Sequence, residues 1–198
     1  ANIASAPAGQ GHQTAISQLL ADIFGVLPSQ IQVNVDFDTA KDAWSIAAGN
    51  YSSRFAGAVA GTVLLAANKL KSRIAEYAAY VLNSTPENLY FSNGSIGVIG
   101  KEDGAIPFGR ICGNFHWSPG LVQKALGDNV VLALQETQYW SPDVLDAPDE
   151  HDRVNTSAAY GFALDACGIE IDPVICAPKV DQYITIHDAG KLLNPALA

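Results

Sequence analysis

An apolar stripe that begins at Phe55 and ends at Val81 constrains the fold of this chain more than any other feature. Its members recur at steps of four and three residues, which places them on one face of a helix; they are Phe55, Val59, Val63, Ala66, Leu70, Ile74, Tyr77 and Val81. The pattern predicts a helix over residues 53–83 that is roughly 45 Å long at the usual rise per residue. Because many alanines and glycines line its first half, we expect it to pack closely and to lie under a sheet.

A second helix is predicted over residues 12–25, directly after the glycine loop Gly9-Gln10-Gly11. The first N–H groups of a helix have no intrahelical partner and carry partial positive charge, so this loop suits a phosphate or another anion. From these residues alone, a plain glycine turn before a core helix is the preferred interpretation, because short glycine motifs often recur by chance.

The start of the long helix is a second possible anion site. Ser52 or Ser53 is expected to cap its first turn, and Arg54 adds a guanidinium beside that cap. Backbone N–H groups, a hydroxyl and a guanidinium together suit a phosphate. The alternative is that Arg54 forms an ion pair with a nearby aspartate.

Most of the remaining periodic segments resemble strands. We predict strands over 31–35, 89–92, 95–99, 128–139, 158–171 and 179–187, a hairpin turn at Asn93-Gly94, a short helix over 107–112 and a loop over 116–120. The fold class is therefore α+β, with long helices packed on a mostly antiparallel sheet. We treat residues 1–198 as one partial domain that is helix-rich over 1–88 and strand-rich over 89–198.

Composition argues against several classes of function. The chain has 11 Lys and Arg against 20 Asp and Glu, and this net charge of −9 disfavours broad binding to nucleic acid or anionic membranes. We find no apolar run long enough for a transmembrane helix and no signal peptide. The widely spaced cysteines favour a reducing, cytoplasmic compartment and small buried apolar roles for all three; they are Cys112, Cys167 and Cys176.

Acidic residues gather in two stretches, at Asp36–Asp42 and Asp149–Asp152. Neither stretch has recognisable ligand spacing, so solvated loops are preferred over metal sites. The nucleophile elbow G-x-S-x-G of many hydrolases and the P-loop pattern G-x4-G-K-[ST] do not occur, which lowers both of those options.

Three separated motifs occur in one order, and they are Gly9-Gln10-Gly11-His12-x-Thr14, Gly49-x-Tyr51-x-Ser53-Arg54 and His187-Asp188-x-Gly190-x3-Asn194-Pro195. Together they resemble the molybdenum-binding large subunit of the molybdenum hydroxylases, a family that includes xanthine dehydrogenase, aldehyde oxidase and aerobic carbon monoxide dehydrogenase. The resemblance extends over nearly the whole chain. It includes the segments Ala21-Asp22-x-Phe24-Gly25-Val26 and Asp38-Thr39.

This resemblance implies a molybdopterin cofactor, often the cytosine dinucleotide in bacteria, whose dithiolene holds molybdenum without any protein ligand. The positions that match the family's motifs are expected to bind it. They are Gly9, Gln10, Gly11, His12 and Thr14 at the pterin and its phosphates, Tyr51, Ser53 and Arg54 at the phosphate or nucleotide, and Asp188 and Asn194 near the nucleotide end.

The resemblance also implies a molybdenum-dependent oxidoreductase that hydroxylates an aldehyde, an N-heterocycle or a related small molecule with oxygen from water. Electrons would leave through iron–sulfur and flavin subunits or domains. The family's catalytic glutamate lies beyond the third motif, so we assign no catalytic residue and expect this piece of the large subunit to be inactive alone. Ser52 and Ala189 depart from the family's usual residues. A non-catalytic molybdopterin carrier or insertion domain is the alternative.

Overall fold

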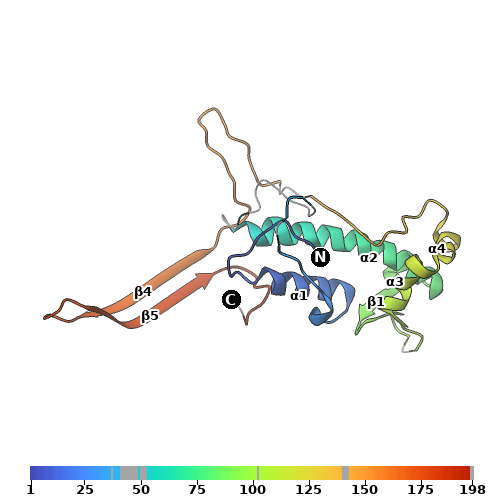
Figure 1. Cartoon of the computed structure of the whole chain (residues 1–198), viewed down its shortest axis with the longest axis horizontal. Helices are drawn as coiled ribbons and strands as arrows, with labels where there is room; N and C mark the ends of the chain where they lie inside the picture. The colour runs from blue at the N-terminus through green and yellow to red at the C-terminus, as the bar shows by residue number, and fades with distance from the viewer. Residues whose placement is uncertain (37, 41–48, 50–52, 102, 140–142, 197–198) are drawn as a thin grey trace.

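The computed structural model describes residues 1–36, 38–40, 49, 53–101, 103–139 and 143–196. Two long helices occupy the first part of the chain, and short strands, two more helices and a long hairpin follow (Figure 1). The elements are α1 (His12–Phe24), η1 (Pro28–Gln30), the π-helical segment η2 (Phe55–Ala60), α2 (Gly61–Val81), η3 (Pro86–Asn88), β1 (Leu89–Ser92), β2 (Ser95–Val98), β3 (Ile106–Pro107), α3 (Phe108–Trp117), α4 (Pro119–Leu126), β4 (Phe162–Ile171) and β5 (Pro178–Asp188).

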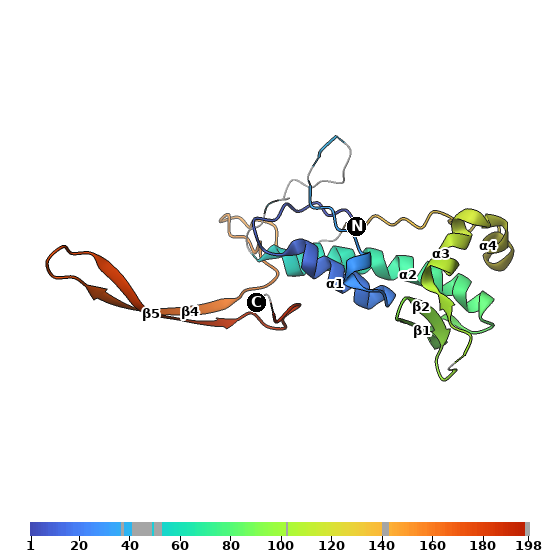
Figure 2. The ribbon, with the colours of Figure 1, turned by 60° about the horizontal axis from the view of Figure 1, so that its bottom comes forward.

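Both predicted long helices are present, and they pack side by side. Figures 1 and 2 show α1 lying along η2 and α2, with both helices starting near the base of the β4–β5 hairpin and running in the same direction. The predicted apolar stripes face the shared core, in which Ile16 and Ile74 are almost fully buried. The long helix differs from the prediction in its first turns, which are π-helical over Phe55–Ala60.

Gly25 ends α1 and joins it to the β1–β2 hairpin. Its φ of +63° places it in the left-handed region, where a glycine commonly ends a helix. A Cβ at this position would collide with the backbone of Phe91, so the absence of a side chain permits the close approach. The backbone N–H of Gly94 then donates to the Gly25 carbonyl at 2.7 Å.

The first sheet has the order β1-β2-β3, and all of its pairs are antiparallel. The predicted turn at Asn93-Gly94 joins β1 to β2, which confirms the hairpin. Ile96 of β2 is fully buried, as are Ile111 of α3 and Val122 of α4, so this end of the molecule has a continuous core. The combination of helices with antiparallel strands confirms the α+β fold class.

Three predicted elements are wrong. Residues 128–139 pair with no strand in the described part of the chain, although they alternate between half-buried and exposed positions. Their half-buried apolar side chains pack on the helical core, and Arg73 donates to the Ala133 carbonyl at 2.7 Å. An extended segment that packs on a helix therefore shows the same alternation of apolar and polar residues as a strand in a sheet.

The other two errors concern residues 31–35 and 116–120. The predicted strand over 31–35 is reduced to one parallel bridge between Asn2 and Asn34. The predicted loop over 116–120 is the junction of two helices, because α3 continues to Trp117 and α4 begins at Pro119. Proline is well suited to the first position of a helix, so Pro119 starts α4 rather than a loop.

The strands predicted over 158–171 and 179–187 form one long antiparallel hairpin, β4–β5. It extends away from the helices in both views (Figures 1 and 2), and every residue of both strands is exposed.

The packing of α2 predicts very different costs for two similar truncations. Ile74→Ala should lower the free energy of unfolding by about 2–5 kcal/mol, because the side chain is only 1% exposed and its removal leaves a cavity. Leu65→Ala on the same helix is the control, since Leu65 is 41% exposed. Denaturant unfolding followed by circular dichroism measures both, and equal losses would contradict the described packing of α2.

Candidate functional site

The first motif forms an exposed loop at the start of α1. Gly11 is the N-cap residue in the left-handed conformation, with φ 72°, and no side chain caps the helix. The first N–H groups of α1 consequently lack helical partners, as the anion-site hypothesis requires. The Gln10 side chain accepts a hydrogen bond from the Ala8 N–H and so folds back on its own loop. Gly9 and Thr14 are exposed beside it.

His12 connects the first motif to the second. Its ring is 1% exposed and stacks on Phe55, with ring centroids 3.8 Å apart and planes 8° from parallel. Both ring nitrogens are buried, and the ring interacts with the backbone of Ser5. Since His12 begins α1 and Phe55 begins η2, this stack brings the starts of two helices together.

The second motif is only partly described. Tyr51 and Ser52 lie outside the described residues, whereas Ser53 is exposed with φ 50° and Arg54 is half-buried at the start of η2. The Nη1 atom of Arg54 is buried. The N-cap residue of η2 is Arg54 rather than Ser53, and its side chain makes no capping hydrogen bond, whereas Ser52, the other predicted cap, lies outside the described residues.

The third motif reaches the same end of the molecule through α1. Asn194 donates from Nδ2 to Gln18 Oε1 at 3.0 Å, and Gln18 lies about 10 Å along α1 from Gly11 at the usual helical rise. Asp188 ends β5, is exposed, and accepts the Gly190 N–H at 3.2 Å. Figures 1 and 2 both show the C-terminal segment beside the beginning of α1.

The electrostatics of this end favour an anion. The starts of α1 and η2 each carry partial positive charge, and Arg54 adds a full charge between segments of a chain whose net charge is −9. Burial lowers the pKa of His12, and the backbone of Ser5 partly offsets this effect. His12 is therefore neutral at neutral pH, and it supplies a neutral ring rather than a further cation.

Two residues of this region were missed as site residues by the sequence analysis. Phe55 was assigned only to the apolar stripe of the long helix, and nothing in its spacing indicates that it stacks on His12. Gln18 lies on α1 and belongs to none of the three motifs, and only the fold shows that it accepts a hydrogen bond from Asn194.

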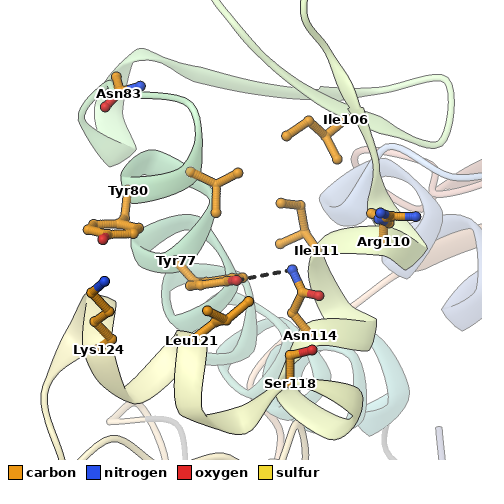
Figure 3. A pocket seen from close by; sticks show the side chains of 11 residues that line it. Tyr77, Tyr80, Asn83, Ile106, Arg110, Ile111, Asn114, Ser118, Leu121 and Lys124 are labelled. Atoms are coloured by element: carbon orange, nitrogen blue, oxygen red, sulfur yellow. Dashed lines mark hydrogen bonds between the residues drawn. The ribbon is translucent and has the colours of Figure 1, made fainter.

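A separate cavity lies beside the C-terminal half of α2. It has a volume of about 750 Å³ and lies between α2, α3 and α4 (Figure 3). Tyr77 and Asn114, joined by a 3.0 Å hydrogen bond, form part of its wall, and Arg110 and Lys124 are its charged groups. None of the predicted cofactor residues lines it, and no sequence motif indicated it.

The environments predicted for the cysteines are wrong at two of the three positions. Cys167 and Cys176 are exposed, so the buried role predicted for them is wrong, because β4 and the turn after it have no covering element. Cys112 is partly buried, and burial raises its pKa to about 11. Asp149 accepts hydrogen bonds from its own loop and pairs with Arg153 at 2.8 Å.

No group of three potential metal ligands gathers in the portion of the chain that the structure describes. That portion also contains no helix long and apolar enough to cross a membrane.

The buried, neutral His12 predicts a loss of stability in mild acid. Because the folded chain binds the His12 proton less readily than the unfolded chain, stability declines as the pH falls below about 6.5, the ordinary pKa of histidine. The melting temperature of the parent chain should therefore fall more than that of His12→Phe between about pH 7.5 and about pH 5.5.

The control is His116→Phe, which removes an exposed histidine from α3 and should follow the parent chain. Parallel curves for the parent and His12→Phe would contradict the burial of a neutral imidazole at this position.

Comparison with known proteins places the chain in a family. All of residues 1–198 match the family of molybdopterin cofactor-binding domains. The chain is 25% identical over 189 residues to the nicotine 6-hydroxylase large subunit of Paenarthrobacter nicotinovorans, covering 96% of this chain and 21% of that protein. It is 24% identical over 190 residues to the carbon monoxide dehydrogenase large chain of Hydrogenophaga pseudoflava, covering 96% of this chain and 21% of that protein.

Solved structures share the fold. Quinoline 2-oxidoreductase from Pseudomonas putida 86 superposes with a TM-score of 0.77 at 23% identity, covering 99% of this chain and 22% of that one. A copper- and molybdenum-containing carbon monoxide dehydrogenase superposes with a TM-score of 0.73 at 21% identity, covering 99% of this chain and 22% of that one. The chain spans about a fifth of the length of its relatives, and its match over all 198 residues makes it a member of the molybdopterin cofactor-binding domain family.

Proposed function

We propose that the adjoining starts of α1 and η2 bind the phosphate and pterin parts of a molybdopterin cofactor. The observation that carries this proposal is the stack of His12 on Phe55, two residues more than forty positions apart in the sequence, which brings the first motif beside the second. Two parallel helices with adjacent starts repel each other through their dipoles, and a bound anion relieves that repulsion.

The individual roles follow the chain. Gly9, Gln10, Gly11, His12 and Thr14 contact the pterin and its phosphates; Tyr51, Ser53 and Arg54 hold the phosphate or nucleotide; Asp188 and Asn194 lie near the nucleotide end. The residues fit such a ligand in two respects. The start of α1 is uncapped, and the loop before it is exposed.

When bound, the cofactor supplies molybdenum through its own dithiolene, so this chain's task is to hold and orient the organic part. We assign no catalytic residue to it. The cytosine dinucleotide is the form that we propose, because Asn194 of the third motif contacts Gln18 in the middle of α1 and provides polar groups about 10 Å from Gly11.

At the level of the whole protein, we propose the large subunit of a molybdenum-dependent oxidoreductase in the cytoplasm. It would hydroxylate an aldehyde, an N-heterocycle or a related small molecule with oxygen from water, and pass electrons to iron–sulfur and FAD-containing subunits or domains. The named relatives, a nicotine 6-hydroxylase and carbon monoxide dehydrogenases, support this proposal.

A non-catalytic carrier or insertion domain for molybdopterin is the second candidate. Its support is the family match, which describes cofactor binding and names no reaction. Turnover by the full-length protein would support the oxidoreductase. Transfer of intact cofactor to a second protein without turnover would support the carrier.

The cofactor site predicts that two substitutions in the full-length protein lower its cofactor content. Arg54→Ala should weaken binding roughly 10- to 100-fold, because a charge-assisted hydrogen bond to phosphate contributes about 1.5–3 kcal/mol. Gly11→Val should do more, since a β-branched side chain cannot readily adopt the left-handed conformation of Gly11 and fills the space above the loop.

Molybdenum and released cytidine nucleotide per mole of purified protein measure the outcome, together with the melting temperature. Arg110→Ala is the matched control, because Arg110 is an exposed arginine in the distant cavity of Figure 3. Full cofactor content in Arg54→Ala and Gly11→Val would remove the assignment of these loops.

A further inference from the structure

The cavity between α2, α3 and α4 combines two cationic side chains with a wall that has no acidic residue. Arg110 of α3 and Lys124 of α4 line it, and none of the described residues that form its wall is Asp or Glu. The whole chain has 20 acidic residues against 11 basic ones, so the charge of this cavity is opposite to that of the protein. The proposed cofactor site lies at the other end of the η2–α2 helix and uses none of these residues.

Arg110 occupies a position that its own helix does not favour. It lies in the first turn of α3, where the helix dipole already places partial positive charge, and this turn has no acidic residue. Arg110 is exposed, and no described carboxylate forms an ion pair with it. Lys124 differs, because it lies in the last turn of α4, where a cation stabilises the helix end. Arg110 is therefore the stronger indication of an anionic ligand.

The two cations lie on opposite sides of the cavity. Figure 3 shows Lys124 beside Tyr80 on one side and Arg110 on the other, with the hydrogen-bonded pair of Tyr77 and Asn114 between them. A single carboxylate at one side reaches one cation. A ligand that has an acidic group at each end reaches both.

The space between the cations suits an apolar body. Apolar side chains line it, and they are Val81, Ile106, Ile111 and Leu121. The Tyr77 ring is held in place by the 3.0 Å hydrogen bond that its hydroxyl oxygen accepts from Asn114 and by an edge contact with Phe115, with ring centroids 5.4 Å apart. The volume of about 750 Å³ is typical of small-molecule sites, which combine apolar walls with a few well-placed polar groups.

We propose that this cavity binds a small organic dicarboxylate. Its apolar body lies between α2, α3 and α4, one carboxylate pairs with Arg110, and the other pairs with Lys124. The guanidinium of Arg110 offers a planar pair of N–H donors that matches a carboxylate, whereas the ammonium of Lys124 acts as a point charge. This second site does not depend on the assignment of the cofactor site.

Two matched naphthalene acids test the proposal in the full-length protein. Naphthalene-2,6-dicarboxylate has an acidic group at each end, and 2-naphthoate has the same body with one acidic group. In equilibrium dialysis, the dicarboxylate should bind at least about tenfold more tightly, because it pairs with both cations. Equal affinities, or no binding of either acid at millimolar concentration, would overturn the proposal.

Replacing either cation should remove the preference for two acidic groups. Arg110→Gln and Lys124→Gln should each lower the affinity for the dicarboxylate about tenfold, to that of 2-naphthoate. Lys101→Gln is the control, since Lys101 is an exposed lysine outside the cavity wall and its loss should leave the affinity unchanged. All three side chains are exposed, so the variants should fold. An unchanged affinity in Arg110→Gln would contradict the proposed site.

A second pair of variants tests the wall of the cavity. Leu121 lines it from α4 and is 56% exposed, so either substitution should be compatible with folding. Leu121→Glu adds a carboxylate to a wall that has none, and it should abolish binding of the dicarboxylate by repulsion. Leu121→Gln has nearly the same shape without the charge and should weaken binding less than about threefold. Equal effects of the two variants would place the ligand elsewhere.

The Arg54→Ala variant distinguishes this site from the proposed cofactor site. If Arg54→Ala weakened binding of the dicarboxylate and Arg110→Gln did not, the acid would bind at the start of η2, and the proposal would be overturned. Weaker binding in Arg110→Gln together with full molybdenum content in Arg54→Ala would instead support the dicarboxylate site and remove the cofactor assignment alone.

Discussion

The stack of His12 on Phe55 is the contact on which the arrangement of the proposed site depends. It joins the first residue of α1 to the first residue of η2, and it does so inside the core, where the ring of His12 is almost completely buried. Stacked aromatic rings contribute about 0.5–1.5 kcal/mol beyond the area that they bury. Because the rings meet at the helix starts, the uncapped N–H groups of α1 and the Arg54 side chain are held at one end of the molecule.

This arrangement has a cost that a ligand can offset. Parallel helices with adjacent starts concentrate positive potential, and among the described residues no side chain caps α1 or η2 to neutralise it. An aspartate at either cap would stabilise the empty domain and would also repel a phosphate. Glycine at the cap of α1 leaves the first N–H groups open, so stability is given up at the position where we propose that the phosphate of the cofactor binds.

Local patterns predicted the helices and hairpins well, because each depends on neighbours that are close in sequence. The stripe from Phe55 to Val81, Gly25 at the end of α1 and Asn93-Gly94 in the β1–β2 turn are all of this kind. The motifs identified the family, but the geometry of the site required the fold. The stack of His12 on Phe55 and the bond between Asn194 and Gln18 join residues that no short pattern relates.

The two alternating segments show why period-two patterns alone mislead. Residues 128–139 alternate because one side rests on α2, where Arg73 binds the Ala133 carbonyl and lies 3.0 Å from Glu136. Residues 162–171 alternate within a real strand, yet no described residue covers their apolar side. The sequence signal is the same in both cases, since it records that one side of the backbone can meet an apolar surface and does not identify that surface. For 128–139 the surface is a helix of the same domain, whereas for β4 none of the described residues supplies it, and its apolar side chains remain in contact with water.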